Sequence, residues 1–385
     1  MSLGRIVVAL TIVSTVLFGV HYYLWARLVR DPALPPPWTT VATVALVVLG
    51  SSGLGGFVLA RVAPRSVASP VMWVVYTWLG LMFFLFVLLA IGDTARIFGK
   101  LVELATGTVP DADRRLTVAR LFAAAVGVLG AGLGWVALAN GLAEVAVKRL
   151  RISLPKLPPA DRPYNLVQLT DIHVGPTIGG AFIRDLVRRV NALEPDAIVI
   201  TGDLVDGSVA ELGSFVAPLA ELRARDGVYF VTGNHEYYSG VDEWLAFLTT
   251  LGIRVLRNER VPVGPFDLAG VDDWSAHSFG KGHGADLPRA MAGRDVERPV
   301  VLLAHQPQAI LEAEALGVDL QLSGHTHGGQ IFPFGYLVAL TSPYVAGLYR
   351  HKRAAIYVSR GTGYWGPPMR LGSPAEITHL ELVSA

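Results

Sequence analysis

Residues 165–173 read Asn-Leu-Val-Gln-Leu-Thr-Asp-Ile-His, and this stretch decides how the C-terminal part of the chain folds. The apolar run that ends at Leu169 is typical of a short buried strand. Asp171 and His173 follow it two residues apart, so in an extended segment their side chains point the same way. The stretch therefore predicts a strand that presents two metal-ligating side chains at its carboxyl end.

Four further apolar runs end in polar residues of the same kind. The runs 197–200, 228–231, 300–303 and 318–322 lead to Gly202-Asp203, Gly233-Asn234-His235-Glu236, His305 and Gly324-His325-Thr326-His327. Between the run that ends at Leu169 and the run 197–200, residues 182–193 carry apolar side chains at helical spacing, and strand, helix, strand in this order indicates an α/β unit. In such sheets the chemistry gathers at the carboxyl ends of the strands.

Five of the ten histidines lie in these polar clusters. A single histidine after a strand would more often be a satisfied core residue, but five of them indicate a metal site. The expected ligands are Asp171, His173 and His327 for one ion, Asn234, His305 and His325 for a second, and Asp203 as the bridge between the two. Two such ions activate a water and hold both the attacking and the leaving oxygen of a phosphoryl displacement. His235 is left without a metal and is expected to give a proton to the leaving oxygen.

The blocks Asp-x-His, Gly-Asp, Gly-Asn-His-Glu, His and Gly-His-x-His, in this order over residues 171–327, resemble the calcineurin-like metallophosphoesterase superfamily. The resemblance covers residues 164–385 and implies an α/β metallophosphoesterase domain, a two-sheet αββα sandwich with a dinuclear centre. With residues 325–330, residues 359–364 and the apolar N-terminal part, the chain resembles the bacterial transmembrane metallophosphoesterases, which include UDP-2,3-diacylglucosamine pyrophosphatases. That branch implies a multi-pass protein of the bacterial inner membrane.

The N-terminal part has the composition of a membrane domain. Residues 6–26, 38–60, 66–92 and 121–143 contain no Asp, Glu, Lys or Arg, and each stretch is long enough to span a bilayer as a helix. A cleavable signal peptide is the alternative for the first stretch, but its apolar run exceeds the usual length. We expect four transmembrane helices in residues 1–150, with glycines such as Gly130 and Gly134 allowing close helix packing. A proline-rich linker at 151–163 and the α/β domain at 164–385 should follow.

Charge is distributed unevenly between the two parts. Residues 1–150 carry 12 Lys/Arg against 6 Asp/Glu, a net +6, and residues 151–385 carry the other 20 against 25, a net −5. No basic stripe suits nucleic acid, so DNA and RNA are not expected partners. The basic cluster Lys148, Arg149 and Arg151 favours a cytoplasmic α/β domain, whereas Arg27 and Arg30 after the first span favour the opposite side.

The substrate is expected to be a phosphoester or pyrophosphate, and the bilayer points to one that is linked to a lipid. Hydrolysis of soluble phosphomonoesters or phosphodiesters, and a membrane sensor or scaffold with little turnover, are the alternatives. Carboxylate, imidazole and amide ligands without sulfur favour Mn as the two divalent ions, with Fe or Zn as substitutes. Arg370, in an aromatic segment, is expected to line the entrance and bind substrate phosphate.

Two further features have alternative interpretations. Asp206, three residues after the predicted bridging aspartate, either orients a ligand or is a turn residue beside Gly207. Residues 272–289 form either a mobile loop over the site or an ordinary surface loop.

Overall fold

The computed structural model describes residues 3–107 and 111–385. The chain divides into two compact units, residues 1–139 with 366–369 and residues 140–365 with 370–385. We call them the membrane unit and the α/β unit.

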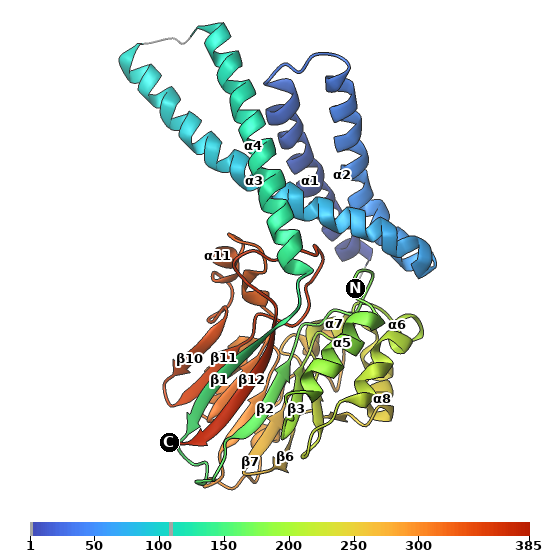
Figure 1. The fold of residues 1–385 in the computed structure, drawn as a ribbon, viewed down its shortest axis with the longest axis vertical. Coiled ribbons are helices and arrows are strands. Elements are labelled where there is room, and N and C mark those ends of the chain that lie inside the picture. Colours follow the sequence, from blue (N-terminus) through green and yellow to red (C-terminus); the bar gives the residue numbers. More distant parts are fainter. Residues whose placement is uncertain (1–2, 108–110) are drawn as a thin grey trace. The chain divides into compact units, whose positions relative to one another are not determined.

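The membrane unit contains four helices that are long and apolar enough to cross a bilayer, as predicted. They are α1 (Leu3–Trp25, followed by the short η1, Ala26–Arg30), α2 (Trp38–Val62), α3 (Arg65–Thr106) and α4 (Ala112–Gly141) (Figure 1). Helix α3 is longer than the apolar stretch 66–92, because residues 93–106 continue it.

Glycines allow the membrane helices to approach one another closely. A Cβ atom added at Gly130 of α4 would lie 2.6 Å from the Leu85 side chain of α3, and one at Gly134 would lie 3.2 Å from Leu81. The predicted use of these glycines is confirmed, and residue 130 has no room for a larger side chain.

Charged side chains at one end of the membrane unit are paired. Arg27 Nη1 lies 2.5 Å from Asp31 Oδ2, and Arg27 also forms an ion pair with Asp93 of α3. Tyr23 donates a hydrogen bond of 2.6 Å to the same Asp93. These contacts join the end of α1 to α3 and give each of the three charged side chains a partner of opposite sign.

The α/β unit consists of two six-stranded sheets. The first has the order β1-β12-β2-β3-β4-β5 and consists of Ala146–Leu154, Glu376–Ser384, Tyr164–Leu169, Ala197–Thr201, Val228–Val231 and Arg254–Val255. The second has the order β10-β11-β9-β8-β7-β6 and consists of Gly347–His351, Ala354–Val358, Leu320–Ser323, Val300–Leu303, Phe266–Gly270 and Glu259–Val263. All five strands predicted from the apolar runs are present, as β2, β3, β4, β8 and β9.

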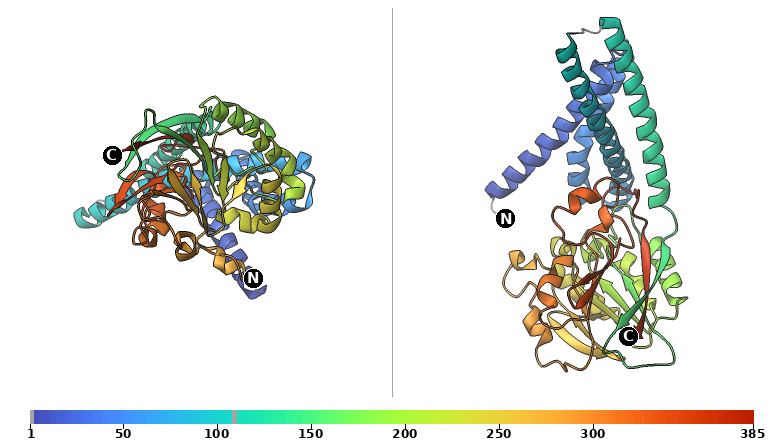
Figure 2. Two further views of the ribbon diagram at one scale, coloured as in Figure 1. Left: turned by 90° about the horizontal axis from the view of Figure 1, so that it is seen from below. Right: turned by 90° about the vertical axis from the view of Figure 1, so that its left-hand side faces the viewer.

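The two sheets face each other with helices outside them (Figures 1 and 2). Three layers of apolar side chains hold this sandwich together. Leu166 and Val199 of the first sheet meet Val301 and Leu322 of the second in a buried core between the sheets. The outer face of the first sheet is covered by α5 (Gly180–Asn191), α6 (Val209–Val216) and α8 (Val241–Thr250), and that of the second by α9 (Leu287–Met291) and α10 (Ile310–Ala313). The predicted αββα sandwich is confirmed.

The sheet begins earlier than expected from the sequence. Residues 146–154 form β1, which pairs in parallel with β12 at the edge of the first sheet. The proposed linker at 151–163 therefore overlaps a strand, and only residues 155–163 lie between β1 and β2. The prolines that suggested a spacer end the strand rather than separate two domains.

Candidate metal centre

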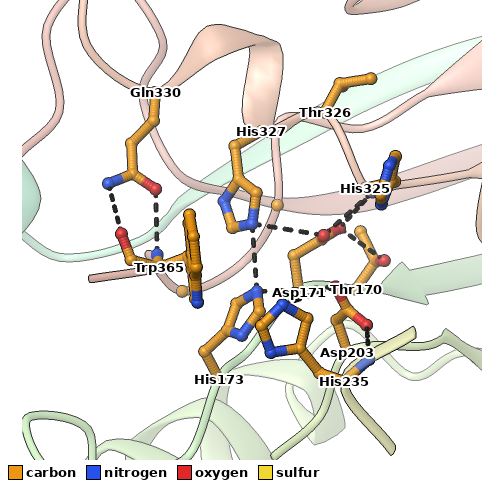
Figure 3. A network of polar contacts seen from close by, with 12 residues as sticks. Thr170, Asp171, His173, Asp203, His235, His325, Thr326, His327, Gln330 and Trp365 are labelled. Carbon is orange, nitrogen blue, oxygen red and sulfur yellow. Dashed lines mark hydrogen bonds and ion pairs between the residues drawn. The ribbon is translucent and has the colours of Figure 1, made fainter. Parts of the chain in front are cut away.

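All the predicted ligands lie at the carboxyl ends of the strands. Asp171 and His173 follow β2, Asp203 follows β3, Asn234 and His235 begin α7 (Asn234–Ser239) directly after β4, His305 follows β8, and His325 and His327 follow β9. Figure 3 shows six of these side chains converging on one small volume. The structure thus brings six of the seven predicted ligands together with His235, and Asn234 directly precedes His235 in the chain.

Asp171, His173 and His327 form the first group of potential ligands, with one ligand atom of each within 4.8 Å of the others. His327 Nε2 lies 3.1 Å from His173 Nε2 and 3.4 Å from Asp171 Oδ1. The Asp171 carboxylate is held by the Thr170 hydroxyl, which donates over 2.7 Å, and by the backbone N–H of His325 at 2.9 Å. The group is buried and preorganised for one cation.

Asp203, His305 and His325 form a second group of the same size. Asp203 Oδ2 lies 3.1 Å from His305 Nε2, and it is also 3.8 Å from His173 Nε2 of the first group. His305 Nδ1 is 2.8 Å from the Thr201 carbonyl, which turns Nε2 of that ring toward the carboxylate. One oxygen of Asp203 therefore lies between the two groups.

Asn234 provides a direct test of whether the residues fit a metal. Its side chain is buried, and its Oδ1 atom has no hydrogen-bond partner among the described residues. A buried carbonyl oxygen without a partner is costly, and a coordinated cation removes that cost. The donor set of carboxylate, imidazole and amide oxygen fits a divalent metal.

Five of the seven predicted ligands have a left-handed backbone. The φ angles are 52° at Asp171, 55° at His173, 53° at Asp203, 70° at His325 and 50° at His327. Residues other than glycine rarely adopt this conformation, and it is stable only where the surrounding structure enforces it. The strands thus end in tight turns that direct the side chains of successive loops toward one point.

Glu236 is a buried residue of the site to which the sequence assigned no role. Its carboxylate accepts hydrogen bonds from the backbone N–H groups of Gly233 at 2.6 Å, Leu204 at 2.7 Å and Asp203 at 3.0 Å. Burial, followed by the nearby Asp203 charge, raises the pKa of Glu236 to about 7. Glu236 joins the loop after β3 to the start of α7. Its position in the Gly-Asn-His-Glu block was the available signal.

Asp206 contacts two histidines of the site, as the interpretation that it orients a ligand requires. Its carboxylate lies 2.5 Å from His235 Nδ1 and 3.2 Å from His173 Nδ1. Burial opposes a charged His235, but the carboxylates of Asp203 and Asp206 outweigh it and raise the pKa of His235 to about 9. The shift favours a protonated His235 whose Nδ1–H is held by Asp206.

His327 is kept neutral, which is the state that binds a metal. Burial, followed by the charges of His173 and Arg370, holds the pKa of His327 well below its usual value. Burial and the neighbouring His305 also lower the pKa of His325. Neither ring has to lose a proton before it can coordinate at neutral pH.

Arg370 does not lie at an exposed entrance as expected. The side chain is 1% exposed, and Nη1 donates to the Ser373 carbonyl at 2.8 Å while Nε donates to the Gly363 carbonyl at 3.0 Å. Nη2 lies 3.4 Å from His327 Nδ1. Binding substrate phosphate would require the guanidinium to leave these partners. Its contacts instead hold the backbone of Gly363 and Ser373 close to the His327 ring.

An aromatic wall, consisting of Trp365 and Tyr238, lies beside His235. The ring centroids of Trp365 and Tyr238 lie 5.7 Å and 5.4 Å from that of His235, and the two side chains are 55% and 64% exposed. Gln330 fixes Trp365 by two hydrogen bonds to its backbone, of 2.9 and 3.0 Å (Figure 3). The wall places apolar surface next to the predicted proton donor.

The segment 272–289 approaches the site through Phe279, whose ring lies 5.5 Å from that of Tyr238. Hydrogen bonds from the neighbouring residues Arg257 and Asn258 hold the segment in place. Arg257 donates to Asp272, and the Asn258 side chain bonds the backbone of Asp272, Gly284 and Asp286. These contacts favour a positioned surface loop over a freely mobile one.

Two facing sheets with histidines and carboxylates gathered at their carboxyl edge define a metal-dependent phosphoester hydrolase. Comparison with known proteins agrees. The calcineurin-like phosphoesterase family model matches residues 164–329. The chain belongs to the calcineurin-like metallophosphoesterase family, and its relatives include transmembrane members.

Three relatives show the extent of the similarity. A Bos taurus protein named "Transmembrane protein with metallophosphoesterase domain" is 38% identical over 410 residues, which cover 100% of this chain and 90% of the bovine one. A Danio rerio protein of the same name is 35% identical over 403 residues, with the same coverage. A Helicobacter pylori "Uncharacterized metallophosphoesterase" is 43% identical over 254 residues, 66% of this chain and 68% of that one. The similarity to the first two includes the membrane unit.

Proposed function

We propose that the chain hydrolyses a phosphoester or pyrophosphate bond at a dinuclear centre. The ligands are Asp171, His173 and His327 at one ion, Asn234, His305 and His325 at the other, and Asp203 at both. The observation that supports this most strongly is the place of Asp203 Oδ2, within 4 Å of a histidine nitrogen of each ligand group. Two divalent ions bound there would neutralise charge on the phosphoryl oxygens and lower the pKa of water.

His235 acts on the leaving group in this proposal. Its Nδ1–H is engaged by Asp206, so the proton available for transfer is on Nε2, which lies 4.0 Å from Asp203 Oδ2. A protonated imidazole beside the site can give that proton to a departing oxygen, which then leaves as a neutral hydroxyl group. Asp206 stabilises the charged ring before the transfer.

We propose Mn as the metal, with Fe or Zn as substitutes. Four imidazoles, two carboxylates and one amide oxygen suit these ions better than Mg, which keeps several waters and prefers oxygen ligands. Protein stripped with a chelator should recover activity with Mn, and full recovery with Mg alone would contradict the assignment.

We propose that the substrate is linked to a lipid, because this would give the membrane unit a role in substrate delivery. The pairings of β1 with β12 and of β12 with β2 place Ala146, the first residue of β1, at the sheet edge where β2 ends and the metal ligands begin. Only residues 142–145 separate β1 from α4. The chain therefore enters the α/β unit at the edge of the metal centre, which would let a substrate headgroup reach the ligands from a bilayer.

The test compares two substrates with the same phosphoester headgroup, one carried by a lipid in mixed micelles and one soluble. A lipid-borne substrate should show the higher kcat/KM with the full chain. Equal values would support the alternative of hydrolysis of soluble phosphoesters. Two bound metals without turnover of either substrate would support the sensor or scaffold alternative.

We also propose that the α/β unit is cytoplasmic. The basic cluster that favoured this side lies in β1, where Lys148 is 3.8 Å from Glu376 and Arg149 Nη1 is 2.7 Å from His379 Nδ1. The natural chain has no cysteine, so a single cysteine introduced at the exposed Val296 is the only thiol that a reagent can label. An impermeant thiol reagent should label Val296→Cys only after the cells are opened, and labelling of intact cells would reverse the assignment.

A further inference from the structure

An exposed apolar surface lies on the α/β unit outside the metal centre. Its large side chains are Phe332, Phe334, Tyr336, Leu337, Leu340, Leu348 and Tyr349, with α11 (Gly335–Val338) in the middle. Leu340 is 81% exposed, Tyr336 71% and Leu337 56%. We call this set the 332–349 surface. So many exposed apolar groups in one short segment usually mark a binding surface.

The charge pattern around this surface is that of a membrane interface. Residues 324–349 contain no Asp, Glu, Lys or Arg, and the exposed Arg350, Lys352 and Arg353 follow directly. Lys352 forms an ion pair of 3.3 Å with Glu314, so Arg350 and Arg353 are the basic side chains of this border that carry the argument. Aromatic and aliphatic side chains bordered by basic ones suit the boundary between acyl chains and anionic headgroups.

The surface belongs to the sheet edge at which the chain enters the α/β unit. It begins five residues after the predicted ligand His327, and its last strand, β10, starts opposite Val358, at the carboxyl end of β11. Ala146 lies at the carboxyl-end edge of β2 in the other sheet. Only residues 142–145 separate Ala146 from the last residue of α4 in the chain.

We propose that the 332–349 surface docks the α/β unit onto the lipid bilayer, with Leu337 and Leu340 among the acyl chains and Arg350 and Arg353 at the headgroups. An apolar pocket of about 300 Å³, lined by Phe332, Tyr336, Val345 and Gly328, opens within this surface. Gly328 is the residue after His327, so the docked surface adjoins the metal centre. The bilayer contact does not require that the substrate itself be a lipid.

The absence of cysteine allows a site-specific test on the full chain in vesicles containing anionic lipid. An environment-sensitive fluorophore is attached to Leu337→Cys or Leu340→Cys. Val296→Cys, an exposed apolar position before the amino end of β8, is the matched control. The labels at 337 and 340 should shift to shorter wavelength and be quenched by a quencher attached to lipid acyl chains. The label at 296 should do neither.

Three outcomes would overturn the proposal. Labels at 337 and 340 that behave like the label at 296 would show that the surface stays in water. A blue shift without lipid quenching would show that protein covers it. Energy transfer between labelled copies, again without lipid quenching, would identify a second copy of this chain as the occupant.

An activity measurement adds a second variant and separates this proposal from the proposed function. Leu337→Glu combined with Leu340→Glu should lower hydrolysis of a vesicle-borne phosphoester several-fold. It should leave hydrolysis of a soluble chromogenic phosphodiester unchanged, and Val296→Glu should change neither. If the natural chain hydrolyses neither substrate, the proposed function has failed, whereas the fluorescence result still decides the docking.

Discussion

Asp206 Oδ1 lies 2.5 Å from Nδ1 of His235. The same carboxylate is 3.2 Å from His173 Nδ1, so one side chain positions both a predicted ligand and the predicted proton donor. This arrangement makes the roles of the two histidines separable by mutation, because only one of them is expected to hold metal.

Replacing His235 by alanine should lower kcat about 100- to 10,000-fold, the usual effect of losing a general acid. Both metals should remain, because His235 is not among the expected ligands. The measurement is kcat together with elemental analysis of the purified variant. The loss should shrink for leaving groups that depart easily without a proton. A variant that loses a metal would instead make His235 a ligand.

Asp206→Asn should move the pH profile as well as the rate. A general acid must be protonated, so the rate falls as pH rises through its pKa. Burial opposes the charged ring, while Asp203 and then Asp206 raise the pKa of His235 to about 9. Removing the Asp206 charge should therefore shift the alkaline limb of kcat to lower pH. Asp185→Asn, in an exposed part of α5, is the control and should leave the profile in place.

Asn234→Ala should bind one metal fewer than the natural protein. The variant removes a buried oxygen that has no other partner, so it breaks no hydrogen bond that the structure shows. Metal content measured after gel filtration should fall while the helical content stays the same. Unchanged metal content would remove Asn234 from the ligand set.

Glu236→Gln should destabilise the α/β unit by about 1–3 kcal/mol. The NH₂ group of glutamine cannot accept a hydrogen bond, so at least one buried backbone N–H would lose its acceptor. The carboxylate now accepts three such bonds, from Gly233, Leu204 and Asp203. Thermal unfolding in detergent and resistance to chelators should both decrease. The control Glu211→Gln, at the exposed start of α6, should have a much smaller effect. Equal effects of the two variants would contradict the special role of Glu236.

The sequence was sufficient for the strands that carry the ligands. Runs such as 197–200 and 300–303 are uniformly apolar because both faces of their strands are buried, and parallel strands bring their carboxyl ends to one edge. This is why Asp171 and His325, far apart in the chain, could be expected at the same site.

Other features depend on pairings that have no local pattern. Strand β1 pairs with β12, over 200 residues later, so its place in the sheet is not visible from residues 146–154 alone. Arg370 looked exposed because it follows an aromatic segment. It is buried because the carbonyls of Gly363 and Ser373 accept its donors, and backbone carbonyls carry no signature in a sequence.

Metal stoichiometry tests the central claim most directly. The full chain, purified in detergent after growth with added Mn, is analysed for bound metals beside Asp203→Ala. The natural chain should contain two divalent ions per molecule and hydrolyse a chromogenic phosphodiester, while Asp203→Ala should lose metal and activity together. One ion per molecule in a fully active natural chain, or an Asp203→Ala variant that keeps both ions and its activity, would contradict a dinuclear centre bridged by Asp203.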